Sequence, residues 1–146
     1  MLIGKYTNTL DPKGRVFVPA AFRNDLGVSF ILTRGVENKS LCIYPMQEWE
    51  KFVAKLQKLP SNTQKGRDIY RSFCSNANYC ELDSQGRLLI PQDLREKAEL
   101  SKEVLFIGML GWIEVWNSDN AKKHEIDSLS EDEESEGLGW DPFSGN

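Results

Sequence analysis

The sequence predicts an α+β fold that contains two tandem β-β-α-β-β repeats, with helices between and after the repeats. This prediction depends first on an internal duplication, because residues 10–26 align with residues 82–98 at a constant offset of 72. Six of the 17 aligned positions are identical, where about one identity would be expected by chance. The identical pairs are Leu10/Leu82, Asp11/Asp83, Gly14/Gly86, Arg15/Arg87, Pro19/Pro91 and Arg23/Arg95. It depends secondly on the residue pattern inside each copy, which alternates strand, turn and helix signals.

Each copy begins with a predicted hairpin. Residues 6–10 favour a β-strand, and residues 15–18 return as a second strand. Between them, Asp11 at the first turn position and Gly14 at the fourth suit a type I turn followed by a glycine bulge. Asp83 and Gly86 occupy the same places in the second copy.

A short helix and a second hairpin complete each copy. Pro19 has no N–H and therefore suits the first position of a helix, and Gly27 can end that helix by adopting a positive φ. Residues 30–33 and 41–44 form the second hairpin, and the second copy repeats the unit as far as residue 116. The predicted boundaries are 5–47 for repeat 1, 48–76 for a helical connector, 77–120 for repeat 2 and 121–146 for a polar helix with an acidic tail.

The connector is predicted to hold two helices. Large apolar residues recur at spacings of three and four, which is typical of an amphipathic helix with its apolar face inward. These residues are Met46, Trp49, Phe52, Val53, Leu56 and Leu59. Residues 60–62 interrupt the pattern, and a second helix is expected to reach Phe73. The aromatic residues of the connector are expected to pack in the core.

Charge is distributed unevenly along the chain. All 18 Lys and Arg residues lie within residues 1–124 together with 14 acidic residues, so this part carries a net charge of +4. Residues 125–146 hold eight acidic residues and no Lys or Arg, which gives the tail a charge of −8 and predicts disorder from residue 128 onward. A basic body with an acidic tail is common among proteins that handle polyanions.

An enzyme, a metal site and an exported protein are all disfavoured. The three cysteines lack C-x-x-C spacing and are interpreted as reduced packing residues. The only histidine, His124, lies in a polar segment, and there is no phosphate-binding glycine-rich loop, so we expect no catalytic residue, no metal and no cofactor. The N-terminus has no signal-peptide core and no segment resembles a membrane span, which predicts a cytoplasmic protein without a membrane partner.

The repeated Asp-x-x-Gly-Arg motif has two interpretations. As a structural turn, Asp accepts bonds from the turn backbone, Gly supplies a positive φ, and Arg pairs with Asp. The turn-forming residues are then Asp11, Gly14, Asp83 and Gly86. As a DNA contact, two matched hairpin tips present side chains that suit the major groove, where Arg binds guanine through two hydrogen bonds. The candidate DNA-binding residues are Lys13, Arg15, Gln85 and Arg87.

The same residues carry a family resemblance. Residues 10–19, 32–35, 44–49, 82–91 and 113–116 resemble the MraZ family of bacterial transcriptional regulators, which have two SpoVT-AbrB-type domains in one chain. The resemblance implies a swapped-hairpin barrel, ring-like homo-oligomers, and sequence-specific binding to repeated double-stranded DNA elements upstream of the division and cell-wall gene cluster, including the protein's own promoter. It therefore implies a nucleoid-associated protein. Gln85 stands where the family often has lysine.

A protein-interaction role is the alternative to DNA binding alone. Antitoxins of this fold bind DNA with one part and a toxin with a flexible tail, and here Leu138, Trp140 and Phe143 lie in the acidic tail as a candidate motif for an unknown partner. The duplication favours the regulator, because such antitoxins usually carry one copy and dimerise.

Overall fold

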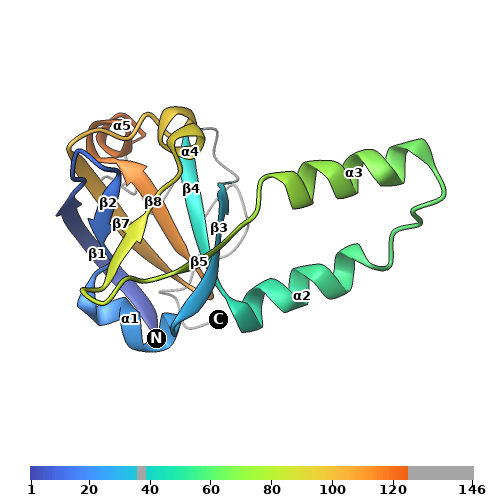
Figure 1. Cartoon of the computed structure of the whole chain (residues 1–146), viewed down its shortest axis with the longest axis horizontal. Helices are drawn as coiled ribbons and strands as arrows, with labels where there is room; N and C mark the ends of the chain where they lie inside the picture. Colours follow the sequence, from blue (N-terminus) through green and yellow to red (C-terminus); the bar gives the residue numbers. More distant parts are fainter. Residues whose placement is uncertain (36–38, 125–146) are drawn as a thin grey trace, which may run out of the picture.

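Two copies of one element order make up the computed structural model, which describes residues 1–35 and 39–124 (Figure 1). The first copy contains β1 (Leu2–Thr9), β2 (Arg15–Phe17), α1 (Ala20–Leu26), β3 (Ser29–Arg34) and β4 (Ser40–Pro45). The helices α2 (Met46–Leu56) and α3 (Gln64–Ser75) follow. The second copy contains β5 (Asn78–Glu81), β6 (Arg87–Leu89), α4 (Gln92–Lys97), β7 (Glu103–Leu110) and β8 (Ile113–Asn117), and α5 (Ser118–Lys123) comes after it. The predicted α+β fold with a tandem repeat is confirmed.

The strands of the two copies are interleaved. The larger sheet has six strands in the order β1-β7-β8-β4-β3-β5, and β2 and β6 form a separate two-stranded ribbon. The first strand of each copy pairs with the third strand of the other, because β1 lies antiparallel to β7 and β5 lies antiparallel to β3. The strand order is therefore the same when read from either end, with copy 1 exchanged for copy 2. We call the sheet, the ribbon and their shared core the barrel.

A single apolar core fills the barrel. Its buried members come from both copies and from both sheets, and they include Phe22 on α1, Phe30 on β3 and Phe106 on β7, each with 0% of its surface exposed. Val16 and Leu88 contribute from the ribbon. Because both copies supply this core, neither copy encloses it alone.

The helices α2 and α3 form a hairpin that projects from the barrel (Figure 1). No residue of α2 is buried, so the expectation that its apolar face packs in the core was wrong. That face packs against α3 and against Tyr44 of β4 instead, and the rings of Trp49 and Phe73 stack at 4.7 Å between centroids. The Tyr70 hydroxyl donates to the carbonyl oxygens of Leu56 and Leu59, at 3.0 and 3.1 Å. The periodicity identified the apolar face correctly but not the surface that covers it.

Local signals at the ends of helices were mostly confirmed. Gly27 follows α1 with a φ of 79°, and its N–H donates to the Arg23 carbonyl as predicted for a helix end. Pro19 is the residue before the helix rather than its first residue, with a ψ of 132° that is not helical.

Among the cysteines, Cys42 is buried and Cys80 is partly buried, but Cys74 is exposed and is not the packing residue that we expected.

Core and ribbon phenylalanines should differ sharply in their contribution to stability. Phe22 is fully buried, whereas Phe17 is 43% exposed on the ribbon. We expect Phe22→Ala to lower the free energy of unfolding by about 3–5 kcal/mol, and Phe17→Ala to lower it by about 1 kcal/mol or less. Urea denaturation of the two variants measures the difference. Equal losses would contradict the placement of the ribbon on the surface.

Candidate nucleic-acid interface

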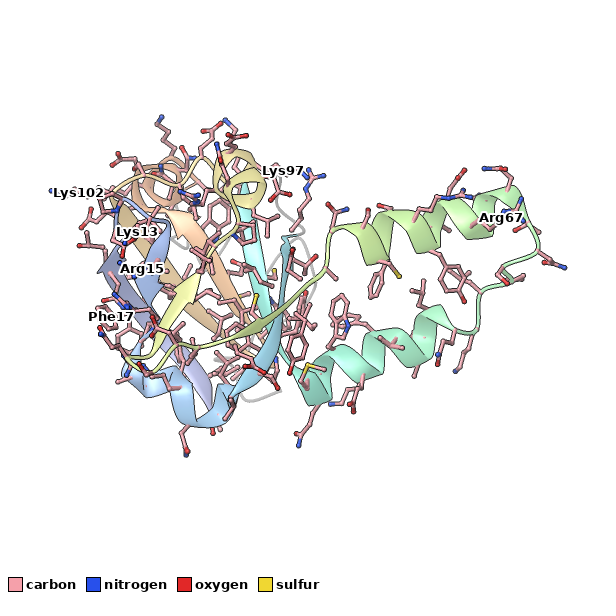
Figure 2. All side chains as sticks on the ribbon, in the orientation of Figure 1. Lys13, Arg15, Phe17, Arg67, Lys97 and Lys102 are labelled. Atoms are coloured by element: carbon pink, nitrogen blue, oxygen red, sulfur yellow. The ribbon has the colours of Figure 1, made fainter. Side chains whose placement is uncertain are left out.

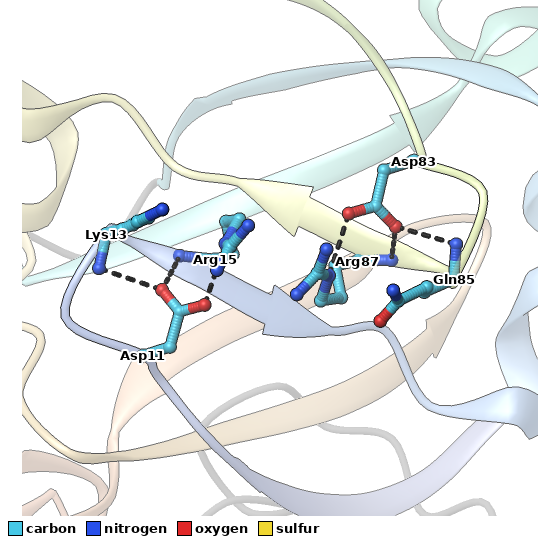
Figure 3. A network of polar contacts seen from close by, with 6 residues as sticks. All are labelled: Asp11, Lys13, Arg15, Asp83, Gln85 and Arg87. Carbon is cyan, nitrogen blue, oxygen red and sulfur yellow. Dashed lines mark hydrogen bonds and ion pairs between the residues drawn. The ribbon is translucent and has the colours of Figure 1, made fainter.

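The ribbon formed by β2 and β6 lies on the barrel on the side away from the helical hairpin, where Figure 2 labels Lys13, Arg15 and Phe17. The two strands are antiparallel, and their register places Arg15 opposite Leu89 and Phe17 opposite Arg87. The strands are one from each repeat. Each predicted Asp-x-x-Gly-Arg turn therefore lies at one end of the same ribbon (Figure 3).

Each aspartate organises its turn. The Oδ1 atom of Asp11 accepts hydrogen bonds from the backbone N–H groups of Lys13 and Arg15, both at 2.9 Å. The Oδ2 atom accepts from Nε of Arg15 at 2.7 Å. Gly14, with a φ of 86°, donates its N–H to the Asp11 carbonyl at 3.0 Å. All the contacts expected of a structural turn are thus present in the first copy of the motif.

The second turn has the same geometry. The Asp83 carboxylate accepts from the backbone of Gln85 and Arg87 at 2.9 Å and from Nε of Arg87 at 2.7 Å (Figure 3). Gly86 also has a φ of 86°. The two ends of the ribbon therefore present the arginines in matched conformations.

Each turn is fastened to the other repeat. The N–H of Ile90 donates to the Gly14 carbonyl at 2.9 Å, and the N–H of Val18 donates to the Gly86 carbonyl at 3.2 Å. A Cβ atom on Gly14 would lie 2.7 Å from Cζ of Arg95, and one on Gly86 would lie equally close to Cζ of Arg23. A positive φ favours glycine at both positions, and a side chain at either one would also displace a guanidinium of the opposite repeat.

The turn arginines are partly buried. The side chain of Arg15 is 31% exposed and that of Arg87 is 21% exposed, so both are less accessible than the sequence suggested. The carboxylate bonds to Nε, at the inner edge of each guanidinium. The Nη1 and Nη2 groups are not used in that hydrogen bond. They form the part of the guanidinium that can donate to paired acceptors on a ligand.

The pKa values of both turn aspartates lie below their usual range. For Asp11 the largest cause is the hydrogen bond from the Arg15 backbone N–H, and for Asp83 it is the bond from the Arg87 backbone N–H. The arginine side chains lower these pKa values further. Both carboxylates are therefore ionised near neutral pH, and each keeps its arginine in place.

The two ends of the ribbon differ in charge. Lys13 lies in the first turn, and the carbonyl of the exposed Lys102 accepts a hydrogen bond from Leu10 just before that turn. The corresponding residues at the second end are Gln85 and Val28, because Val104 matches Phe30 in the aligned third strands. The first end therefore carries two lysines where the second carries none in the equivalent positions.

Sequence reasoning missed two pairs of residues near this surface. Arg23 and Arg95 were visible as identities of the repeat, but their contact with the opposite glycine depends on the interleaved fold. Phe17 and Leu89 are exposed on the ribbon, beside the buried Val16 and Leu88. The alternation of inward and outward side chains along β2 and β6 could have identified Phe17 and Leu89 as exposed, but strands of three residues are too short to show it clearly.

The remaining features of the described chain are a cavity lined by aromatic rings and scattered acidic residues. Within residues 1–35 and 39–124, no three His, Cys, Asp or Glu side chains gather as metal ligands, and no helix is long and apolar enough to cross a membrane. A cavity of about 380 Å³ lies where the helical hairpin meets the barrel, and aromatic rings including Tyr44 and Trp49 line it. Burial raises the pKa of Tyr44, which disfavours its use as a base.

Comparison with known proteins agrees with this architecture. A family model described as "MraZ protein, putative antitoxin-like" matches the chain twice, over residues 1–72 and 73–136. A relative from Alkaliphilus metalliredigens is 48% identical over 134 residues, which cover 91% of this chain and 93% of the relative. Relatives from Thermoanaerobacter sp. and Halothermothrix orenii are 45% and 48% identical, and each alignment covers at least 81% of both chains.

All three relatives are named "Transcriptional regulator MraZ". The two-repeat barrel and the names of these relatives place the chain in a class of transcription regulators. The prediction that the chain is not an enzyme is thereby confirmed. The chain belongs to the MraZ family. The resemblance noted in the sequence is confirmed as well.

Acid should weaken the two turns. The variant Asp11→Asn/Asp83→Asn keeps an oxygen that accepts backbone bonds but loses the charge that pairs with arginine. Because the folded-state pKa of each carboxyl lies below the free value of 3.8, ionisation stabilises the fold above that value, and the stabilisation is lost as pH falls through the folded pKa.

The difference in free energy of unfolding between the wild-type chain and this variant should thus be constant from about pH 7 to about pH 5 and shrink below about pH 4. Denaturation across a pH series measures it. A difference that stays constant down to the lowest pH at which the wild-type chain folds would contradict the prediction.

Proposed function

We propose that the chain is a sequence-specific DNA-binding regulator that contacts double-stranded DNA through the β2–β6 ribbon and its two turns. The observation that carries this proposal is the matched pair of arginines, Arg15 and Arg87, each held through Nε by an aspartate of its own turn. An arginine fixed in this way keeps its outer amino groups available for acceptors. Lys13 and Gln85, at the tips of the two turns, complete the proposed contact residues.

The shape of the ribbon supports the major groove as its target. That groove is about 12 Å wide and admits a two-stranded β-ribbon. It exposes the O6 and N7 acceptors of guanine, which a guanidinium binds through two parallel hydrogen bonds. Since fixed side chains lose little entropy on binding, the carboxylate of each turn favours such recognition.

Binding by several chains together is the second part of the proposal. One chain offers two base-reading arginines and a body with a net charge of only +4 over residues 1–124. Linked binding units gain affinity through effective concentration without any new contact. We therefore propose a homo-oligomer, ring-like as the family resemblance implies, on repeated operator elements.

The location of these elements follows from the family. We propose that they lie upstream of the division and cell-wall gene cluster, including the chain's own promoter, and that the protein is cytoplasmic and nucleoid-associated.

We also propose that the chain has four functional segments: repeats at 5–47 and 77–120, a connector at 48–76 and a tail at 121–146. The motif Leu138, Trp140 and Phe143 lies outside the described residues, and its unknown partner stays a proposal.

The turn arginines should be required for operator binding. We expect Arg15→Ala to weaken operator affinity by about 1–3 kcal/mol per subunit contact, because a guanine loses a paired donor. Arg87→Ala should do the same at the second end. Fluorescence anisotropy with operator DNA that is selected from random duplexes by the wild-type chain measures both losses.

Arg71→Ala is the matched control. Arg71 also pairs with an aspartate, Asp68, at 3.0 Å, but it lies on α3 in the helical hairpin. We expect this variant to keep operator affinity. If Arg15→Ala lowers the melting temperature but retains the affinity of the folded protein, the turn arginines are structural and the proposed contact is wrong.

The proposed assembly makes operator spacing critical. Adjacent chains that face the same groove need repeats about one helical turn apart, near 10 bp. Inserting about 5 bp between repeats turns the second repeat to the opposite side of the duplex and should sharply weaken binding. Equal affinity for the shifted operator, or for a single repeat, would contradict an oligomer that binds several repeats at once.

A further inference from the structure

The outer face of the β2–β6 ribbon carries two large apolar side chains. Phe17 is 43% exposed and Leu89 is 59% exposed, whereas their neighbours Val16 and Leu88 are each 1% exposed. Side chains alternate between the two faces of a strand, so Phe17 and Leu89 lie on the same face as the turn arginines. This face is therefore part cationic and part apolar.

The apolar side chains are placed systematically. Each occupies the third position of its strand, two residues after the turn arginine, and each lies opposite the arginine of the other repeat. Cζ of Arg87 lies 6.0 Å from the centre of the Phe17 ring, a distance at which a cation and an aromatic face attract each other. A single exposed apolar residue needs no explanation, but the same exposure at both equivalent positions does.

Packing within the chain does not account for this placement. The core cluster includes Val16 and Val18 on either side of Phe17, and Leu88 and Ile90 on either side of Leu89, but neither exposed residue belongs to it. The Asn8 side chain of β1 donates to the Phe17 carbonyl at 2.6 Å and so links the ribbon to β1. The outer face of the ribbon thus alternates guanidinium and apolar groups.

We propose that Phe17 and Leu89 read the methyl groups of thymine in the major groove, an inference that rests on the proposed DNA contact. Thymine is the base that presents a methyl group there, and phenyl or alkyl side chains recognise it by apolar contact. Residues two apart on a strand are about 6.6–6.8 Å apart, which is close to two steps of about 3.4 Å along a DNA strand. Each turn arginine and its apolar neighbour therefore read a guanine and a thymine within about two base pairs of each other.

The two ends should not be equivalent in this respect. The flat ring of Phe17 can cover a methyl group more fully than Leu89 can, and Phe17 lies at the second end of the ribbon, across from Arg87. A thymine contacted by Phe17 should thus contribute more to affinity than one contacted by Leu89.

Deoxyuridine tests the proposal, because it differs from thymidine only by lacking the methyl group. Operator duplexes selected from a random pool by the wild-type chain are remade with each thymine replaced singly by deoxyuridine. We expect replacement of the contacted thymine to weaken wild-type binding about three- to fivefold, the effect of losing one buried methyl group. Phe17→Ala and Leu89→Ala should each bind the unmodified operator about as weakly as the wild-type chain binds the deoxyuridine operator. Replacing the thymine that the lost side chain contacted should then weaken binding of that variant no further.

Ile69→Ala is the matched control, since Ile69 is 40% exposed but lies on α3 in the helical hairpin. Operator binding by Ile69→Ala should still weaken when the contacted thymine is replaced by deoxyuridine. The proposal is overturned if no thymine is sensitive in the wild-type chain, or if sensitivity persists in both ribbon variants. It is also overturned if light scattering shows that these variants change the number of chains in the assembly, because the side chains then serve subunit contact.

The outcome for Arg15→Ala separates this inference from the proposed function. If Arg15→Ala loses operator binding while deoxyuridine has no effect, DNA binding by the ribbon stands and only thymine reading falls. If no operator can be selected, or if Arg15→Ala and Arg87→Ala leave operator affinity unchanged, both proposals are wrong.

Discussion

Pairing between the two repeats, rather than within either, holds the barrel together. β1 of the first repeat is paired along its whole length with β7 of the second, and β5 is paired with β3. Within the six-stranded sheet, β1 and β5 each have a single neighbour, which belongs to the other repeat, so a repeat that lost the other would leave these strands unpaired. The ribbon depends on the same exchange, because the carbonyls of Gly14 and Gly86 accept from Ile90 and Val18 of the opposite repeat. The two turns are therefore held at a fixed separation by the same bonds that close the fold.

Features that depend on a few neighbouring residues could be predicted from the sequence. The aspartate and glycine of each turn lie within four residues of the arginine that they position, and the turn chemistry predicted their bonds. The start of α5 is equally local, because the Asn117 side chain accepts from the backbone N–H groups of Asp119 and Asn120. The projecting hairpin could not be predicted. Periodicity shows that α2 has an apolar face, but it does not show whether the barrel core or the neighbouring helix α3 covers that face.

The candidate site was predictable to the same extent. The turn residues were identified because they repeat, whereas the roles of Arg23 and Arg95 depend on contacts between repeats about 70 residues apart. No local rule places the guanidinium of one repeat against the glycine of the other. Phe17 and Leu89 were missed for a different reason. Each ribbon strand has only three residues, one pointing inward and two outward, which is too few to reveal the two-residue period of a strand. Phe17 and Leu89 therefore look like core residues in the sequence until the strand register is known.

Fusion of the two repeats in one chain has a consequence for recognition. A dimer of single-repeat chains presents two identical halves, and the DNA that matches it is palindromic. In this chain the halves have diverged at equivalent positions, with Lys13 against Gln85 and Phe17 against Leu89. Under the proposed function, the first end of the ribbon, with Lys13, holds phosphate more strongly, and the second end, where Phe17 lies across from Arg87, holds thymine more strongly. This difference gives the bound element a direction. Chains that associate head to tail then all read the DNA in the same sense, and such contacts close into rings when the rotation between subunits permits. A direct repeat, rather than an inverted one, is the operator that this arrangement favours.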